Sequence, residues 1–366
     1  MKSFTHYLLV ISISFLFVSR VNAYEMTDKL SLNGILAGAM QCQNLSSNTA
    51  GESTCKSAVP FQPELTYRLT SYDTFFLKLG WALGNGLSDE SPFNIPPWGA
   101  DLEDDVENIN GSGRDYILEA RYTKNFYSDD NTRIAITLGI IDASSYLDQT
   151  AYANDEYRQF MNPALSNAPN AFFPAYDPGI AAEWFLEDWV FSAVYMDVNQ
   201  NTSSDNYSFY GVQAAYRLET TLGTGNYRVS VNGDKNFIDQ TGESKQKNNI
   251  LIISMDQQFG DEIAAFARLG WRLDDENIDY QAIYSGGIDI SGISWGRLPD
   301  NIGLGLVYLE GDDRRLVNTR IAEAYYRMVT DNYLAFTFDI QYMHDEYVKT
   351  TEASGMIYSF RATLNY

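Results

Sequence analysis

The chain has 366 residues, of which 48 are Asp or Glu and 25 are Lys or Arg, and its formal net charge is -23. This charge excludes nucleic acid as a partner, because binding to phosphates requires a basic surface. The mean hydropathy is -0.27, and no apolar run after Ala23 approaches the roughly 20 residues that a membrane-spanning helix needs.

The first 23 residues have the pattern of a removable export signal. Lys2 and His6 give a weakly basic start, residues 7–18 form an apolar run, and residues 21–23 fit a small-residue cleavage site. We therefore predict a signal peptide over residues 1–23 and a mature protein that begins at Tyr24. The alternative is an uncleaved membrane anchor, which the short apolar run disfavours.

In the mature chain, apolar residues recur at every second position, and 26 tyrosines bring the aromatic content of the sequence to 14%. A membrane barrel distributes its apolar side chains in this way, because one face of each strand meets lipid and the other meets water. The last strand is the clearest case. Its predicted lipid face is Met356, Tyr358, Phe360, Ala362, Leu364 and Tyr366. Its predicted inner face is Ile357, Ser359, Arg361, Thr363 and Asn365.

Five further runs alternate as clearly over about ten residues, enough for a tilted strand to cross a bilayer. They lie at 75–83, 116–122, 133–140, 263–273 and 334–342, and Leu118 is among the residues expected to face lipid. Ten weaker candidates begin near Leu30, Val59, Pro178, Trp189, Asn206, Asn226, Asn248, Asp279, Asn301 and Thr319. Together they predict an all-β fold over residues 24–366, a transmembrane antiparallel β-barrel of about sixteen strands.

The lengths of the connections agree with this fold. Every second connection is short, and the two longest of the others lie at about 84–113 and 142–177. Short periplasmic turns that alternate with longer external loops are typical of outer-membrane barrels. The alternative is a soluble sandwich, which would also alternate but has no reason to sort its loops in this way.

The connection at 142–177 is too long for an idle hairpin loop. We predict that it folds into the barrel and constricts it. Asp148, Asp155, Glu156 and Arg158 stand there among aromatic residues, and aromatic faces can stack on sugar rings while charged groups bind hydroxyls. The alternatives are a surface loop, or a plug that narrows the pore without selecting solutes.

The alternation also predicts rows of charged side chains in the lumen. The basic ones are Arg68, Arg121, Arg133, Arg217, Arg228, Arg268, Arg272, Arg327 and Arg361. The acidic ones are Glu64, Glu119, Glu183, Glu219, Asp256, Asp289, Glu323 and Asp339. Opposed rows of this kind would focus a field across a narrow pore. The alternative for any single arginine is an ordinary ion pair of the wall, and a shift of one residue would invert a strand.

From these rows and the long loop we select the candidate residues of the solute path. They are Asp148, Asp155, Glu156, Arg158, Arg68, Arg121, Arg133, Arg217, Arg268 and Arg361.

The two cysteines, Cys42 and Cys55, would meet an oxidising compartment after export, and we predict that they form a disulfide. No histidine stands near them, so a metal site is not expected. The acidic run between Asp101 and Glu107 lacks the spacing of a calcium loop. We interpret that run as a solvated surface.

Three segments resemble the carbohydrate-selective porin family, the OprB-like porins. The first, LGIIDASSYLDQTAYANDEYRQFMNPAL (138–165), contains Asp148, Ala153-Asn154-Asp155 and Phe160-Met161-Asn162, which are similar to motifs of that family. The second is GISWGRLPDNIGLGLVY (292–308), and the third is AEAYYRMVTDNYLAFTFDIQY (322–342). Their order and spacing agree with the family as well.

The resemblance implies a sixteen-stranded pore of the bacterial outer membrane, with an in-folded loop, that passes carbohydrates and other small hydrophilic solutes. Such a porin works by passive diffusion and requires no cofactor, and its partners are solutes and the lipid bilayer. A homotrimer is one arrangement that the sequence leaves open. The Asn-, Ser- and Thr-rich insert between Cys42 and Cys55 departs from the family pattern, so selectivity at the entrance does not carry over.

Two other classes of function stay open. A structural or adhesive barrel would bind a partner through its external loops, including the loop between Cys42 and Cys55. A hydrolase would need a general base, and His344 is the one histidine that remains after signal removal. No serine elbow or zinc motif accompanies it, so we expect no enzymatic activity.

Overall fold

The computed structural model describes residues 24–129, 132–199, 206–235, 248–274, 279–312, 315–349 and 352–366. The predicted signal peptide lies outside the described residues. The strands are β1 (Tyr24–Thr27), β2 (Leu30–Leu45), β3 (Cys55–Ala58), β4 (Phe61–Arg68), β5 (Asp73–Leu79), β6 (Ile117–Asp129), β7 (Thr132–Ile141), β8 (Asp177–Leu186), β9 (Trp189–Val198), β10 (Tyr207–Thr220), β11 (Gly223–Lys235), β12 (Asn248–Phe259), β13 (Ile263–Arg272), β14 (Tyr280–Ser291), β15 (Asn301–Gly311), β16 (Leu316–Val329), β17 (Leu334–Tyr347) and β18 (Ala353–Asn365). The short helices are α1 (Glu103–Val106), η1 (Ile109–Gly111), η2 (Ala143–Ser145), α2 (Pro163–Ser166), η3 (Pro169–Ala171) and η4 (Gly292–Trp295).

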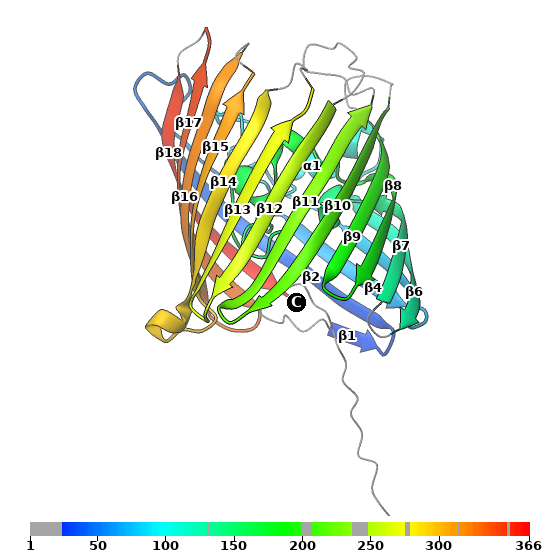
Figure 1. Ribbon diagram of the computed structural model, residues 1–366. Coiled ribbons are helices and arrows are strands. Elements are labelled where there is room, and N and C mark those ends of the chain that lie inside the picture. Colours follow the sequence, from blue (N-terminus) through cyan, green and yellow to red (C-terminus); the bar gives the residue numbers. More distant parts are fainter. Residues whose placement is uncertain are drawn as a thin grey trace, which may run out of the picture.

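Every strand from β4 to β18 pairs antiparallel with the next, and β18 pairs with β2, which closes the sheet (Figure 1). β3 and β4 lie one after the other along β2 and together form one strand of the ring. Pro60 stands between them, and a proline has no N–H to give to the ladder. β1 is a short partner of the first residues of β2. The described residues therefore confirm the predicted barrel of sixteen strands.

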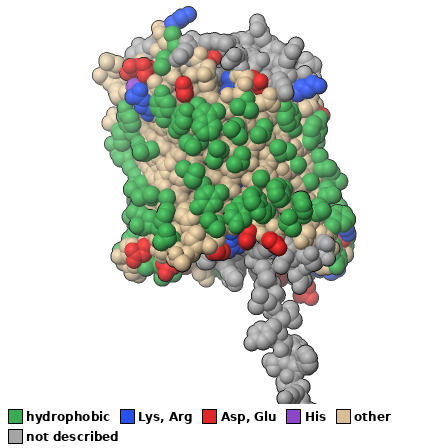
Figure 2. Space-filling view, viewed as in Figure 1, with side chains coloured by type: hydrophobic (Ala, Val, Ile, Leu, Met, Phe, Trp, Pro, Cys, Tyr) green, Lys and Arg blue, Asp and Glu red, His purple; other side chains and the backbone are tan. Residues whose placement is uncertain are grey.

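Closure matters because an open sheet edge would leave its N–H and C=O groups without partners in lipid. The outer face is apolar, with Phe338, Tyr358 and Leu306 among its exposed side chains. Figure 2 shows hydrophobic side chains as a broad belt on one face of the barrel, with charged groups gathered toward the two rims. Among the described residues, no helix combines the length and the apolar character needed to cross a bilayer.

The alternation predicted for the last strand is confirmed. In β18, Ser359 and Arg361 are buried inside the barrel, whereas Tyr358 and Phe360 are exposed on its outer face. Leu118 of β6 is an exception, because it was expected to face lipid and is instead buried. The pairing of β5 with β6 shifts register between Lys78 and Leu79, and a bulge of this kind turns the following side chains to the other face.

The connections sort to the two ends of the barrel as expected. Turns such as 187–188 and 221–222 join strands at the end where β1 and the C-terminus lie, and the long connections 80–116 and 142–176 start from the opposite end (Figure 1).

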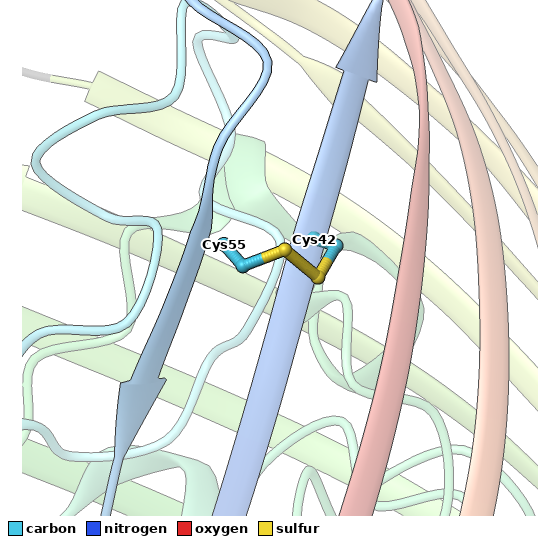
Figure 3. The surroundings of a disulfide bond; sticks show 2 residues. All are labelled: Cys42 and Cys55. Atoms are coloured by element: carbon cyan, nitrogen blue, oxygen red, sulfur yellow. A yellow bond between two sulfur atoms is a disulfide. The ribbon is translucent and has the colours of Figure 1, made fainter.

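Cys42 of β2 and Cys55 of β3 stand opposite each other in the ladder and form a disulfide (Figure 3). Their Cα atoms are 4.0 Å apart and 13 positions apart in sequence. Cys42 also stands opposite Tyr358, whose side chain is on the outer face. The bridge is therefore on the outer side of the wall rather than in the lumen.

One part of the interior is an apolar core. Inward side chains of β12 to β18, including Ile252, Phe266 and Tyr325, form a buried cluster with residues of the 80–116 and 142–176 segments. The prediction of a mainly polar inner face is confirmed for β17 and β18. Part of the inner face of β12 to β16 is apolar instead, because two chain segments cover it and exclude water from it. The same fact explains why β12 alternates weakly in sequence, since apolar side chains serve both of its faces.

Candidate functional site

The 142–176 segment takes its shape from local caps. The Asp142 carboxylate accepts a hydrogen bond from the Ser144 backbone N–H and begins η2. The Asn162 side chain does the same for Ala164 at the start of α2, where Pro163 occupies the first helical position. Both are standard ways to satisfy the free N–H groups of a helix start.

Arg268 of β13 holds this segment by its side chain. Its Nε lies 2.7 Å from a carboxylate oxygen of Asp148. Its two terminal nitrogens donate to the carbonyls of Leu165 (2.8 Å), Ser166 (3.1 Å) and Ala153 (3.2 Å). Neither Arg268 nor Asp148 has any exposed side-chain surface. The sequence analysis placed Arg268 and Asp148 on the solute path. In the structure they form a buried ion pair that joins β13 to the 142–176 segment.

Three side chains of β16, β17 and β18 bind the middle of the segment. The Glu323 carboxylate accepts the backbone N–H groups of Met161 and Asn162, at 2.5 and 3.1 Å. The Asn162 side-chain amide donates to Gln341 at 3.2 Å. Arg361, which is completely buried, also belongs to this set.

The Arg361 guanidinium donates to the backbone carbonyls of Glu156 (2.6 Å) and Gln159 (2.8 Å). Arg361 was likewise predicted to line the path, and it too serves to position the segment. Sequence alternation identified its inward direction correctly but carried no information on what would cover it.

Apolar contacts complete this attachment. The Phe160 ring lies 5.0 Å from the ring centre of Tyr325 and 5.5 Å from that of Phe266. Phe160 and Leu165 pack over Gly305 of β15, where an added Cβ would come within 2.9 Å of both side chains. A glycine at this point lets the segment lie directly on the strand.

The 80–116 segment also enters the interior, which sequence analysis did not predict. The Asn94 backbone N–H donates to Asp345 of β17 at 2.7 Å. The Trp98 indole N–H donates to the Glu156 carbonyl at 2.9 Å, so the two segments support each other. The signal that could have revealed this is the apolar content of residues 93–98, which a solvated loop does not need.

Asp101 corrects the interpretation of its acidic run as a solvated surface. Its carboxylate accepts hydrogen bonds from the Tyr176 hydroxyl (2.7 Å) and the Gln62 side-chain amide (2.5 Å). Its backbone N–H donates to the Tyr157 hydroxyl at 3.1 Å. Burial, and next the negative charge of Asp101, raises the pKa values of Tyr157 and Tyr176 well above that of an ordinary tyrosine. Both hydroxyls therefore stay protonated and able to donate.

The strands β4 to β8 present a different inner surface, which we call the charged wall. It consists of Glu64, Lys78, Glu119, Arg121, Arg133 and Glu183, and these side chains are half-buried except for Glu119, which is buried. In the ladder Lys78 stands directly between Glu64 of β4 and Glu119 of β6. The sequence analysis predicted the inward direction of the two arginines and the three glutamates of this wall.

The arginines of the charged wall already have partners. The Arg121 Nε lies 2.9 Å from a Glu119 carboxylate oxygen, and the Arg121 guanidinium lies 4.3 Å from the ring centre of Phe76. The Arg133 guanidinium lies 3.9 Å from the ring centre of Phe185. Stacking on an aromatic face holds the planar guanidinium in place and leaves its positive charge intact.

The 142–176 segment places Asp155, Glu156 and Arg158 near this wall. Arg158 forms an ion pair with Asp155 at 2.8 Å and donates to Asn365 of β18 at 2.6 and 3.0 Å. Glu64 is an electrostatic neighbour of Arg158, and Lys78 is one of Glu156. Burial, followed by the charges of Asp155 and Asp101, raises the pKa of Glu156 to about 8.

The other predicted path residues lie elsewhere. Arg68 is exposed at the end of β4, next to a short turn. Arg217 pairs with Glu219 at the short-turn end of β10, where both side chains are exposed. These two arginines belong to the rim of the barrel and are not brought together with the 142–176 segment.

His344 stands near the outer end of β17, opposite Arg320 and Ser354 in the ladder. Among the described residues, no group of three or more His, Cys, Asp or Glu side chains is arranged to hold a metal ion.

Comparison with known proteins places this geometry among outer-membrane porins. The structure of Pseudomonas putida OprB at high pH superposes with a TM-score of 0.72 at 13% identity, covering 92% of this chain and 94% of that one. The outer membrane channel DcaP of Acinetobacter baumannii gives 0.57 at 10% identity, covering 92% and 97%. A variant of the Rh. blastica porin gives 0.55 at 13% identity, covering 92% and 100%. The fold is that of the outer-membrane porins.

The sequence comparisons are less specific. No family model matches the chain. An uncharacterized protein of Aquifex aeolicus (strain VF5) is 29% identical over 290 residues, which is 76% of this chain and 80% of that protein. The resemblance to the carbohydrate-selective family therefore stays a prediction, and the porin fold is established independently of it.

Proposed function

We propose that this chain is a bacterial outer-membrane channel through which small hydrophilic solutes, carbohydrates among them, diffuse passively. The observation that carries the proposal is the unequal interior of a closed barrel whose outside is apolar. The 142–176 segment packs on β12 to β18 and, through Tyr146 and Leu147, on β8 to β10, whereas most charged groups of the charged wall on β4 to β8 stay half-buried. A plug would be expected to bury polar groups on both sides.

Within this proposal, the path runs between the charged wall and the 142–176 segment, which forms the constriction. Asp155, Glu156 and Arg158 line it on the segment side, and Arg121 and Arg133 line it on the wall side. Arg268, Arg361 and Asp148 position the segment. Partly exposed charges suit the transfer of polar solutes, because they exchange hydrogen bonds with hydroxyls and exclude apolar molecules.

The function and the location of the chain follow from the same observations. An apolar belt on a closed barrel supports insertion in the outer membrane, and the predicted signal peptide supports export. The proteins with a similar fold include one named an outer membrane channel. A homotrimer stays a prediction.

The test is the single-channel conductance of the purified chain in a planar bilayer, with glucose and maltodextrins titrated in. We expect stepwise conductance that the sugars block in a saturable way. Replacing Arg158 by Gln should weaken the block, whereas the same change at Arg217 on the rim should not. Conductance without saturable block would keep the channel and remove the preference for sugars.

An absence of conductance from demonstrably folded barrels would contradict the proposal. The chain would then fit a structural or adhesive barrel, and the external loop closed by Cys42 and Cys55 would be the first surface to examine for a partner.

A further inference from the structure

We infer that the proposed channel selects by charge, and that cationic solutes such as amines pass the charged wall more readily than anionic solutes of the same size. This inference rests on the proposed function and gives it a solute class. It follows from how the structure distributes the basic groups of the interior, which the sequence alone placed together in the lumen.

Most arginines that would favour anions are either buried away from the proposed path or form ion pairs with carboxylates. Arg268 and Arg361 are completely buried, and their guanidiniums are bound by backbone carbonyls of the 142–176 segment. Arg121 and Arg158 are about one quarter exposed, and each forms an ion pair with a carboxylate, Glu119 and Asp155 respectively. Arg133, stacked on Phe185, contributes the remaining positive charge of an arginine.

Carboxylates are not balanced in the same way. Glu64 and Glu183 on the wall are half-buried, and among the described residues neither forms an ion pair within 4.0 Å. Glu156 on the segment is half-buried as well, and it adds a further negative charge above about pH 8. Asp101 and Asp142 face the same space, where their carboxylates accept hydrogen bonds from uncharged groups. The accessible lining therefore carries an excess of negative charge.

The surroundings of Lys78 provide a separate observation, because they show which groups of this lining lie around an ammonium group. Its nearest charged neighbours are Asp101, Glu119, Glu64 and Asp142. Its Nζ lies 5.7 Å from the ring centre of Tyr176, within range of a cation–π contact. Lys78 thus has the surroundings that a passing amine would meet, with carboxylates on several sides and an aromatic face.

The distances favour an effect on permeation. Charges in solution are screened beyond about 8 Å at physiological salt, so the acidic external loops contribute little. A solute between the charged wall and the segment touches the lining, which places it well inside that distance. The sign of the lining therefore outweighs the overall net charge of the chain.

The experiment is the reversal potential of the purified full-length protein in a planar bilayer under a KCl gradient. We expect K⁺ to be several-fold more permeant than Cl⁻. In liposomes, lysine should enter faster than glutamate, which is similar in size and opposite in charge. Pores with equal permeability or with a preference for Cl⁻ would overturn the inference and leave the channel intact, whereas folded protein without pores would overturn the proposed function.

Variants locate the effect. Glu64→Gln at neutral pH, and Glu156→Gln at about pH 9, where the Glu156 carboxylate is ionised, should each lower the ratio of K⁺ to Cl⁻ permeability by about twofold to fivefold, which corresponds to one unit charge at contact distance in water. Lys78→Gln should raise the ratio. Glu310→Gln is the matched control, because Glu310 is exposed on the outer face of β15. A response in the control equal to that of Glu64 and Glu156 would also overturn the inference.

Discussion

The two halves of the barrel interior are built from the same strand pattern and differ in almost every other property. On β12 to β18, inward side chains are covered by two chain segments and form a core with buried polar ties. On β4 to β8, the inward side chains include the charged wall, most of which is half-buried, next to buried uncharged residues such as Gln62 and Thr137. The alternation of a strand predicts only which side chains point into the barrel. Whether such a side chain is buried in an apolar core, binds a chain segment or lines the path depends on the segment that packs over it.

This comparison predicts that changes in the packed half loosen the 142–176 segment, and that changes on the charged wall alter solute choice without loosening it. Each experiment below tests one side of that division.

The largest effect is expected from Arg268→Met. It leaves the Asp148 carboxylate buried without its partner, and breaking a buried pair in this way costs about 3–5 kcal/mol. Because about 1.4 kcal/mol is a factor of ten, backbone amides of residues 142–176 should exchange hydrogen faster by about 100-fold to several thousand-fold. Hydrogen exchange with mass spectrometry measures this directly.

Two controls define that result. Arg217→Met removes an exposed pair at the rim, where an ion pair contributes at most about 1 kcal/mol, and should leave the segment unchanged. Adding Asp148→Asn to Arg268→Met should restore part of the protection, because the uncompensated charge is gone. Unchanged exchange in Arg268→Met would show that this pair does not hold the segment.

A somewhat smaller effect is expected from Leu165→Ala. Leu165 is completely buried against Gly305 and the aromatic cluster, and a Leu-to-Ala change in a core costs about 2–5 kcal/mol. Exchange in the segment should rise, with little change in the ratio of K⁺ to Cl⁻ permeability. Leu304→Ala, one residue from Gly305 and exposed toward lipid, is the matched control and should leave the segment protected.

On the charged wall, the expected effect is a dependence of selectivity on pH. The pKa of Glu156 is raised to about 8 by burial and by the carboxylates of Asp155 and Asp101, so its charge is absent below that pH and present above it. Between pH about 6 and about 9 the permeability ratio of K⁺ to Cl⁻ should therefore increase, by about twofold to fivefold for one unit charge.

Glu156→Gln should remove that increase, and reversal potentials measured at both pH values provide the check. A full pH response in the Gln variant would assign the titration to another group.

The smallest effect on permeation is expected at the disulfide. Cys42→Ser combined with Cys55→Ser should leave conductance and the permeability ratio unchanged, because the bridge is on the outer side of the wall (Figure 3). Chain entropy assigns a bridge that closes a loop of about this length roughly 3 kcal/mol, so a lower midpoint of thermal unfolding is the one expected change. Altered selectivity would connect the external loop to the path.

The sequence by itself determined the barrel. A side-chain period of two is a local property of each strand, so the inward direction of Arg121, Arg268 and Arg361 could be predicted without knowing any neighbour. The lengths of the connections separated the two ends, and the length of 142–177 marked it as unusual. Where local geometry changed, as at the bulge beside Leu118, the prediction failed.

Only the tertiary structure decided what each inward residue does. Arg268 and Leu165 are 103 positions apart in sequence, and nothing local to β13 indicates that a carbonyl of the 142–176 segment will reach its guanidinium. The entry of the 80–116 segment is equally non-local, since Asn94 and Asp345 meet across 251 positions. Burial depends on what a distant segment places over a side chain, and for that reason the charged wall and the buried anchors, alike in sequence, differ in the folded molecule.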